Sequence, residues 1–183
     1  MFGSLIFDWL SPKADVKRIA RELYGAIVTE ARRETYYAAW GVADRPEGRL
    51  EMILVLMVAV LARLEAEGQP GQALARALTE HMIIDLDDNF REMGIGDLTV
   101  PKRVKKAAAA LFDRHRDYRA ALAQGDDAAL TARMAEAFGT TEPSALPARM
   151  AAHLRQTVAA LASQPGPDIL AGKVRFAPPV TNT

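Results

Sequence analysis

The chain contains no cysteine, which excludes several kinds of protein. It can form no disulfide, and it has no thiolate nucleophile and no Cys-based zinc or iron-sulfur site. Net charge is also absent, because 23 basic and 23 acidic side chains cancel. No overall field therefore draws the protein toward nucleic acid or a membrane. We expect no DNA partner, and any charge-driven contact must come from a local patch.

Strand-like alternation of apolar and polar residues is missing over any useful length. Apolar residues recur instead at helical spacing, as at Ile19, Leu23 and Ile27. A chain of 183 residues is long enough for one domain with one sizeable core. We predict an all-α fold, a single compact bundle of six or seven helices around a buried central helix at about residues 50–65.

The longest apolar run, from Met52 to Ala62, is too short for a transmembrane helix. Its eleven residues would cover only about half of a hydrocarbon layer roughly 30 Å thick. Such a run is typical of a helix buried on all sides in a protein core. It is therefore the predicted central helix.

The two ends of the chain differ in composition from its middle. Residues 1–12 are rich in apolar side chains but lack the positive region of a secretory signal, so we expect either a short packed element or a surface helix on a membrane. Ser11-Pro12 predicts a stop before the next helix. Residues 13–163 form the predicted helical domain. Residues 164–183, rich in proline and glycine, form a predicted extended tail that is partly ordered at best.

Three aromatic residues close the first long predicted helix, which we expect to run to about Ala39. Tyr36, Tyr37 and Trp40 precede Gly41, a residue suited to the left-handed conformation at a helix C-terminus. Such a cluster is either a lid on the core or a contact surface for a partner.

A stripe of polar residues marks the helix predicted to start near Gln72. His81, Asp85, Asp88 and Glu92 lie on one side of it at 100° per residue. A metal-binding helical protein is a minor alternative, although no second helix supplies matching ligands. The main expectation is an acidic face that is either solvated or paired with basic residues.

A glycine-containing turn follows this stripe. Gly94 and Gly96 lack the strand and the third glycine of a phosphate-binding loop, so Gly94 is predicted to end one helix. The next helix is predicted to start at Thr99 or its neighbour, with Pro101 at an early position. That helix opens with Lys102, Arg103, Lys105 and Lys106, which oppose the helix dipole. These cations could pair with the acidic stripe, bind an anionic partner such as lipid headgroups or RNA, or keep the surface soluble.

No catalytic constellation is visible, because Ser, His and Asp residues are scattered and no nucleophile motif exists. From the residues alone the chain is predicted to be a helical interaction protein with no metal and no cofactor.

Two blocks of the sequence resemble the ubiquinol-cytochrome c chaperone family, the assembly factors of the respiratory cytochrome bc complex. The first block spans residues 23–64 and contains TYYAAWGV. The second contains LDDNFREMGIGD, residues 86–97, and continues to Arg114 and Tyr118. Family members often carry a histidine in the apolar central helix, whereas Met52 to Ala62 contains none.

The resemblance implies a non-enzymatic factor that binds newly made cytochrome b and helps it reach its assembled state. Mitochondrial relatives work with a small partner protein and near the ribosome exit region. The implied location is the cytoplasm, with peripheral contact at the inner face of a bacterial membrane, or the mitochondrion in a eukaryote. Carried onto this sequence, the expected partner-binding residues are Tyr36, Tyr37, Trp40, Asp85, Asp88, Arg91, Glu92, Lys102, Arg103, Lys105 and Lys106.

Overall fold

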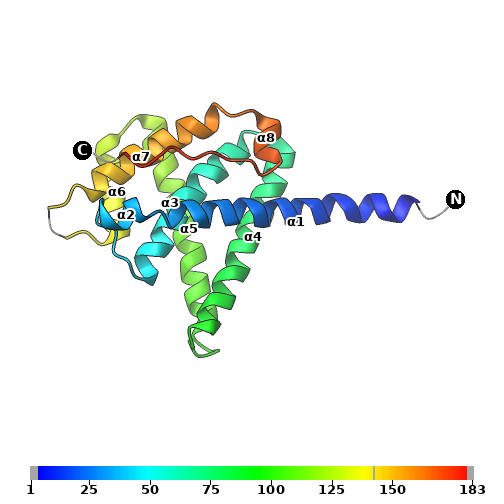
Figure 1. The fold of residues 1–183 in the computed structure, drawn as a ribbon, viewed down its shortest axis with the longest axis horizontal. Coiled ribbons are helices and arrows are strands. Elements are labelled where there is room, and N and C mark those ends of the chain that lie inside the picture. Colours follow the sequence, from blue (N-terminus) through cyan, green and yellow to red (C-terminus); the bar gives the residue numbers. More distant parts are fainter. Residues whose placement is uncertain (1–3, 142, 181–183) are drawn as a thin grey trace.

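Helices form the whole architecture of the described chain, which comprises residues 4–141 and 143–180 of a computed structural model (Figure 1). Six helices have twelve or more residues and two have five, so the predicted all-α bundle is confirmed for these residues. They are α1 (Ser4–Ala31), α2 (Glu34–Ala38), α3 (Pro46–Glu65), α4 (Gly68–Glu92), α5 (Val100–Gln124), α6 (Asp127–Phe138), α7 (Leu146–Ala162) and α8 (Gly166–Leu170).

Helix α3 is the centre of the fold, as the apolar run predicts. It packs against α1, α4, α5, α6 and α7, and every side chain from Leu54 to Leu61 is buried. Burial on all sides explains a helix with no polar face. Within residues 4–141 and 143–180, no helix is both long and apolar enough to cross a membrane.

Charged residues at both ends of α3 tie it to its neighbours. Near its start, Glu51 receives two hydrogen bonds from the Arg114 guanidinium of α5, at 3.0 and 3.2 Å. Burial raises the pKa of Glu51 above its ordinary value, against the opposing effect of Arg114. Near its end, Arg63 donates to the backbone carbonyls of Leu161 and Gln164, both at 3.0 Å. These contacts hold the ends of the central helix while its middle packs through apolar side chains.

Helix α1 differs from the expectation at both ends. It continues through Pro12, where a stop was predicted, and the side chains of residues 1–13 lie outside the described part of the structure. It ends at Ala31 rather than near Ala39, because Arg33 is extended (φ −59°, ψ 129°) and separates α1 from α2. The break turns α2 back onto the body, where Tyr37 donates a hydrogen bond to the Ala31 carbonyl at 2.7 Å.

The C-terminal segment is packed onto the body, so residues 164–180 are more ordered than the expected extended tail, which was to be partly ordered at best. Ile169 in α8 is fully buried, and the side chain of Gln164 bonds to the backbone of Arg175 through both its amide nitrogen and its oxygen, at 2.8 and 2.9 Å. The following chain runs back along α1 and α7 (Figure 1) and ends near α2, where the Trp40 indole donates to the Val180 carbonyl at 3.2 Å. The proline and glycine residues of this segment therefore belong to an ordered stretch of chain that follows the protein surface.

The tight connection between α3 and α4 generates a prediction about stability. A Cβ added at Gly71 would overlap the Leu64 carbonyl, whereas a Cβ at Gly25, in the middle of α1, would meet nothing. We expect Gly71→Ala to lower the free energy of unfolding by about 1–3 kcal/mol, because the helices must separate. Gly25→Ala, the matched control, is expected to raise it by about 0.5–1 kcal/mol. Urea denaturation measures both, and equal effects of the two substitutions would contradict the close approach.

Candidate functional site

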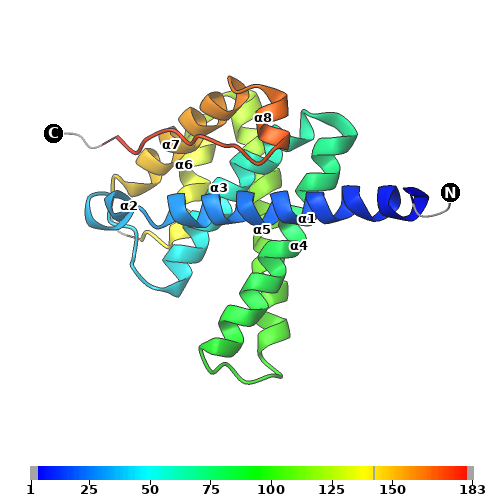
Figure 2. The same ribbon diagram turned by 45° about the vertical axis from the view of Figure 1, so that its right-hand side comes forward.

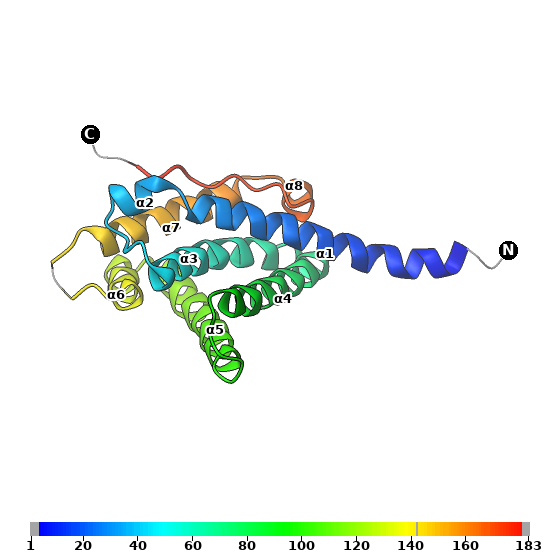
Figure 3. The ribbon, with the colours of Figure 1, turned by 60° about the horizontal axis from the view of Figure 1, so that its bottom comes forward.

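A helical hairpin made of the second half of α4 and the first half of α5 projects from the body. The two helices pack against each other, and the turn that joins them, residues 93–99, is the part of the hairpin farthest from α3 and α7 (Figures 2 and 3). The acidic stripe and the basic cluster expected from the sequence both lie on this hairpin. It is therefore the candidate interaction site.

The turn is built by the glycine and proline residues predicted to form it. Gly94 has φ +73°, its N–H donates to the Arg91 carbonyl at 2.9 Å, and the N–H of Ile95 donates to the Phe90 carbonyl at 3.1 Å. These bonds cap the end of α4 as a left-handed glycine does. The Gly96 carbonyl then receives the N–H groups of residues 99 and 100, and Pro101 lies in the first turn of α5.

Arg91 fastens the turn to the end of α4. Its guanidinium contacts Asp87 on the preceding helical turn and Asp97 in the loop, both at 2.6 Å. All three side chains are solvent-exposed or half-buried, so the contact orients the loop more than it stabilises the fold. Arg91, an expected partner-binding residue, is thus already engaged within the hairpin.

The acidic stripe divides into an inner half and an outer half. His81 packs edge-on against the Tyr24 ring, with centroids 5.3 Å apart, and Asp85 accepts a hydrogen bond from the Tyr24 hydroxyl at 2.9 Å. Asp88 and Glu92 are exposed. The positions of His81 and Glu92 are separated by about 16 Å along the helix, too far for one ion. In the described part of the chain no three potential ligands gather, so the minor metal-site alternative lacks support.

The basic residues at the start of α5 do not pair with the acidic stripe. Lys102, Arg103, Lys105 and Lys106 are exposed, and none of the ion pairs among described residues includes them. Of the three alternatives for these cations, pairing with the acidic stripe is therefore not what the structure shows, and an anionic partner or a solvated surface remains. The two helices pack against each other, and apolar side chains of both belong to one hydrophobic cluster, among them Leu86 and Phe90 of α4 and Val104 and Ala107 of α5. Only Arg103 reaches across, with its guanidinium carbon 6.0 Å from the centroid of the Phe90 ring.

Exposed apolar side chains on the hairpin were missed by sequence reasoning. Leu98 is 90 % exposed, Phe112 64 %, Ile84 58 % and Met93 56 %. The sequence could have predicted the exposure of Phe112. Neighbouring residues of a helix are 100° apart, so Phe112 cannot lie on the same side of α5 as the buried Leu111. Four large apolar groups on one projecting hairpin are more than scattered exposure requires, and they indicate a contact surface.

The aromatic cluster lies elsewhere and faces inward. Tyr36 and Trp40 are buried, so the expectation that they present a surface to a partner is wrong, and Tyr37 is half-buried. The rings of Tyr36, Trp40 and His153 pack together with centroids 5.3–5.4 Å apart. Gly41 follows with φ +83°, and its left-handed turn directs the chain into the loop before α3. The cluster is a structural lid over the end of α1.

A buried hydrogen-bond chain runs through that lid. The Tyr36 hydroxyl donates to Glu30 at 3.0 Å and lies 2.8 Å from Nε2 of His153. Because the hydroxyl has one proton, His153 must donate from Nε2, which leaves its buried Nδ1 unprotonated and without a partner among the described residues. A second proton would bury an uncompensated charge. Burial, assisted by the charge of Arg33, accordingly lowers the pKa of His153 to about 4.

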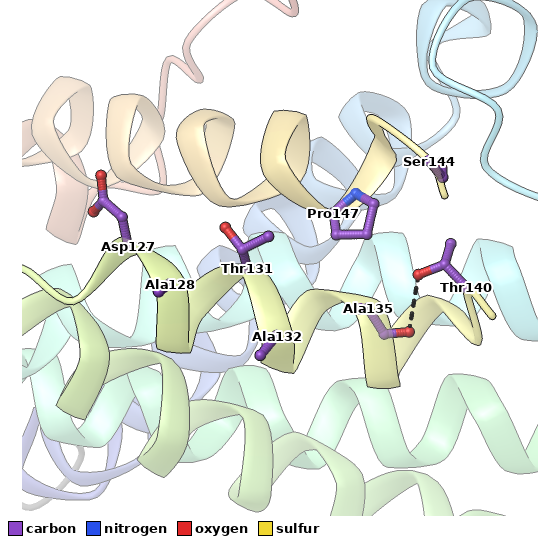
Figure 4. Close-up of a pocket in the computed structure, with 8 residues that line it drawn as sticks. All are labelled: Asp127, Ala128, Thr131, Ala132, Ala135, Thr140, Ser144 and Pro147. Atoms are coloured by element: carbon purple, nitrogen blue, oxygen red, sulfur yellow. Dashed lines mark hydrogen bonds between the residues drawn. The ribbon is translucent and has the colours of Figure 1, made fainter. Parts of the chain in front are cut away.

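An open groove lies between α6 and α7, lined mainly by small side chains such as Ala128, Ala132 and Thr131 (Figure 4). Its carboxylate, Asp127, is already paired with Arg155 of α7, and Thr140 uses its hydroxyl to bond the Ala135 carbonyl at 3.2 Å. No group in the groove is arranged for nucleophilic or acid-base chemistry. The groove offers no reason to assign a reaction to the protein.

Comparison with known proteins identifies the family of the chain, which the geometry of the site does not reveal. A family model described as ubiquinol-cytochrome C chaperone matches residues 38–176. The chain belongs to the ubiquinol-cytochrome c chaperone family. The match includes α3, the whole α4–α5 hairpin and the docked C-terminal segment as far as residue 176, so the candidate site lies inside the shared domain.

A solved structure supports the same conclusion at the level of the fold. The crystal structure of the Cbp3 homolog from Brucella abortus superposes with a TM-score of 0.82 at 30 % sequence identity, over 94 % of this chain and 97 % of that one. A search of curated proteins finds no match. Family membership makes the protein an assembly chaperone for the ubiquinol-cytochrome c reductase complex, and a chaperone family implies binding rather than catalysis.

The buried His153 predicts a specific dependence of stability on pH. The pKa of its imidazole is about 4 when folded and about 6.5 when unfolded, so the unfolded chain alone gains a proton as pH falls between these values. Stability contributed by neutral His153 is complete above pH about 6.5 and is lost toward pH about 4. The variant His153→Gln, which can still donate to Tyr36, is expected to lose about 2 kcal/mol less between pH 6.5 and 4.5.

Urea denaturation across this range measures the difference in slope. His115, whose pKa is also lowered by burial, and the carboxylates are common to both proteins and cancel in the comparison. Parallel pH profiles would show that His153 does not titrate as its burial requires.

Proposed function

We propose that this assembly chaperone binds newly made cytochrome b and holds it until it enters the cytochrome bc complex. The observation that carries the proposal is the family match over residues 38–176, which includes the projecting hairpin. Cytochrome b is the client that the family resemblance implies. A small partner protein and the ribosome exit region are further expected contacts, and the proposed location is the cytoplasmic side of the membrane in a bacterium.

The outer face of α4 is the proposed client surface. Ile84 is exposed there beside Asp88 and Glu92, and these two carboxylates form no ion pair among the described residues. Loops of membrane proteins on the cytoplasmic side carry an excess of Lys and Arg. An acidic face with an apolar side chain complements such a loop and the hydrophobic segment next to it.

A deletion strain tests the function itself. Loss of the protein is expected to lower the level of assembled cytochrome bc complex in membranes, and the tagged protein is expected to recover cytochrome b labelled during synthesis. Normal complex levels together with no cytochrome b in the bound fraction would reject the proposal.

Charge reversal on α4 tests the surface. The double variant Asp88→Lys, Glu92→Lys is expected to recover about tenfold less newly made cytochrome b, because like charges then oppose the basic loop. Glu34→Lys, at an exposed carboxylate of α2 without an ion pair among the described residues, is the matched control and should bind normally. Thermal unfolding should be similar for all three proteins. If the double variant and the control recover equal amounts of cytochrome b, the client does not bind this face of α4.

A further inference from the structure

The outer face of α5 carries an amphipathic stripe distinct from the acidic face of α4. Residues 102, 105, 109 and 112 recur at spacings of three and four, so they lie in one line along α5. Phe112, 64 % exposed, ends this line, which also holds Lys102, Lys105 and Ala109, and Leu98, 90 % exposed, lies in the turn just before the helix. The stripe points away from the side of α5 that buries Val100, Ala107 and Leu111.

The charge on this face has one sign. No Asp or Glu occurs from residue 98 to residue 112, while Lys102, Lys105 and Lys106 are exposed and take part in no ion pair of the described residues. The nearest acid beyond the stripe, Asp113, is paired with Arg116 at 3.1 Å. Carboxylates of the hairpin lie on α4 and in the loop, and Asp87 and Asp97 are held by Arg91. The lysines also oppose the helix dipole, so helix stability does not account for them.

We propose that the outer face of α5 docks the protein on an anionic lipid bilayer. Leu98 of the turn and Phe112 of α5 insert into the interface, while the ammonium groups of the lysines between them in the sequence reach the phosphates. Lysine stems can lie along apolar surface with their charged ends in the headgroup layer. Because a bilayer is flat and uniformly negative, it matches a straight stripe with one sign of charge. The acidic face of α4 then remains turned away from the lipid and open to a client.

Flotation of the purified full chain with lipid vesicles tests this proposal. Because the assay contains no cytochrome b, its result does not depend on whether cytochrome b is the client. The protein is expected to float with phosphatidylcholine vesicles that contain phosphatidylglycerol, weakly with phosphatidylcholine alone, and less as ionic strength rises. Neutralising Lys102, Lys105 and Lys106 to Gln should lower the partition coefficient by about tenfold or more. Phe112→Ser should lower it by about tenfold.

A matched control removes the same charge elsewhere. The triple change Arg21→Gln, Arg76→Gln, Lys173→Gln alters exposed cations outside the stripe and should leave flotation near the wild-type level. Because the chain has no natural cysteine, a single environment-sensitive dye can be attached to the variant Ala109→Cys. Its emission wavelength should shift to the blue on anionic vesicles. The emission of the same dye on Glu34→Cys should not shift.

Equal flotation of the two triple variants, or no blue shift at residue 109, would overturn the proposal. So would a wild-type protein that ignores anionic vesicles but binds an acidic peptide through Lys102 and Lys105, because the stripe would then serve a protein partner.

Discussion

The uninterrupted apolar surface of α3 is the constraint on which the rest of the structure depends. Each large aliphatic side chain from Leu54 to Leu61 contributes about 1.5–3 kcal/mol only if it is kept from water, and no side of this helix is polar. Five other helices therefore surround it. Two of them, α4 and α5, have 25 residues against 20 in α3 and continue beyond the core that they cover. One half of α4 and one half of α5 cover α3, and the remaining halves extend past it and form the projecting hairpin.

Polar contacts specify how the surrounding helices meet. Glu51 with Arg114 and Arg63 with two backbone carbonyls occur at the ends of α3, where desolvation is incomplete, while the chain from Glu30 through Tyr36 to His153 joins α1, α2 and α7 inside the protein. A buried hydrogen-bond chain tolerates few alternative arrangements, because a lost partner leaves an unsatisfied group. The hairpin, in contrast, keeps its charged residues at the surface. The buried polar contacts thus join helices of the body, whereas most charged residues of the hairpin are in contact with solvent.

Periodicity in the sequence was sufficient to predict the parts of the fold that depend on local rules. The apolar run predicted α3, Gly94 marked the end of α4, and Pro101 marked the first turn of α5. The break between α1 and α2 contains no glycine or proline, so nothing in the local sequence predicts it. The docked segment after Gln164 has a composition typical of free tails. Both depend on tertiary contacts. The separation of acidic and basic faces was also hidden, because charge spacing along one helix does not show which way the neighbouring helix turns.

The hydrogen bond between Trp40 and the Val180 carbonyl joins positions 140 residues apart. Together with the buried Ile169, it makes residues 164–180 part of the outer layer of the domain, laid over helices that precede them in the chain. Closing so long a stretch of chain costs conformational entropy, and the packed helices reduce that cost by holding its two ends close together. We therefore expect the C-terminal segment to dock after helices α1 to α7 have assembled, as a late step in folding.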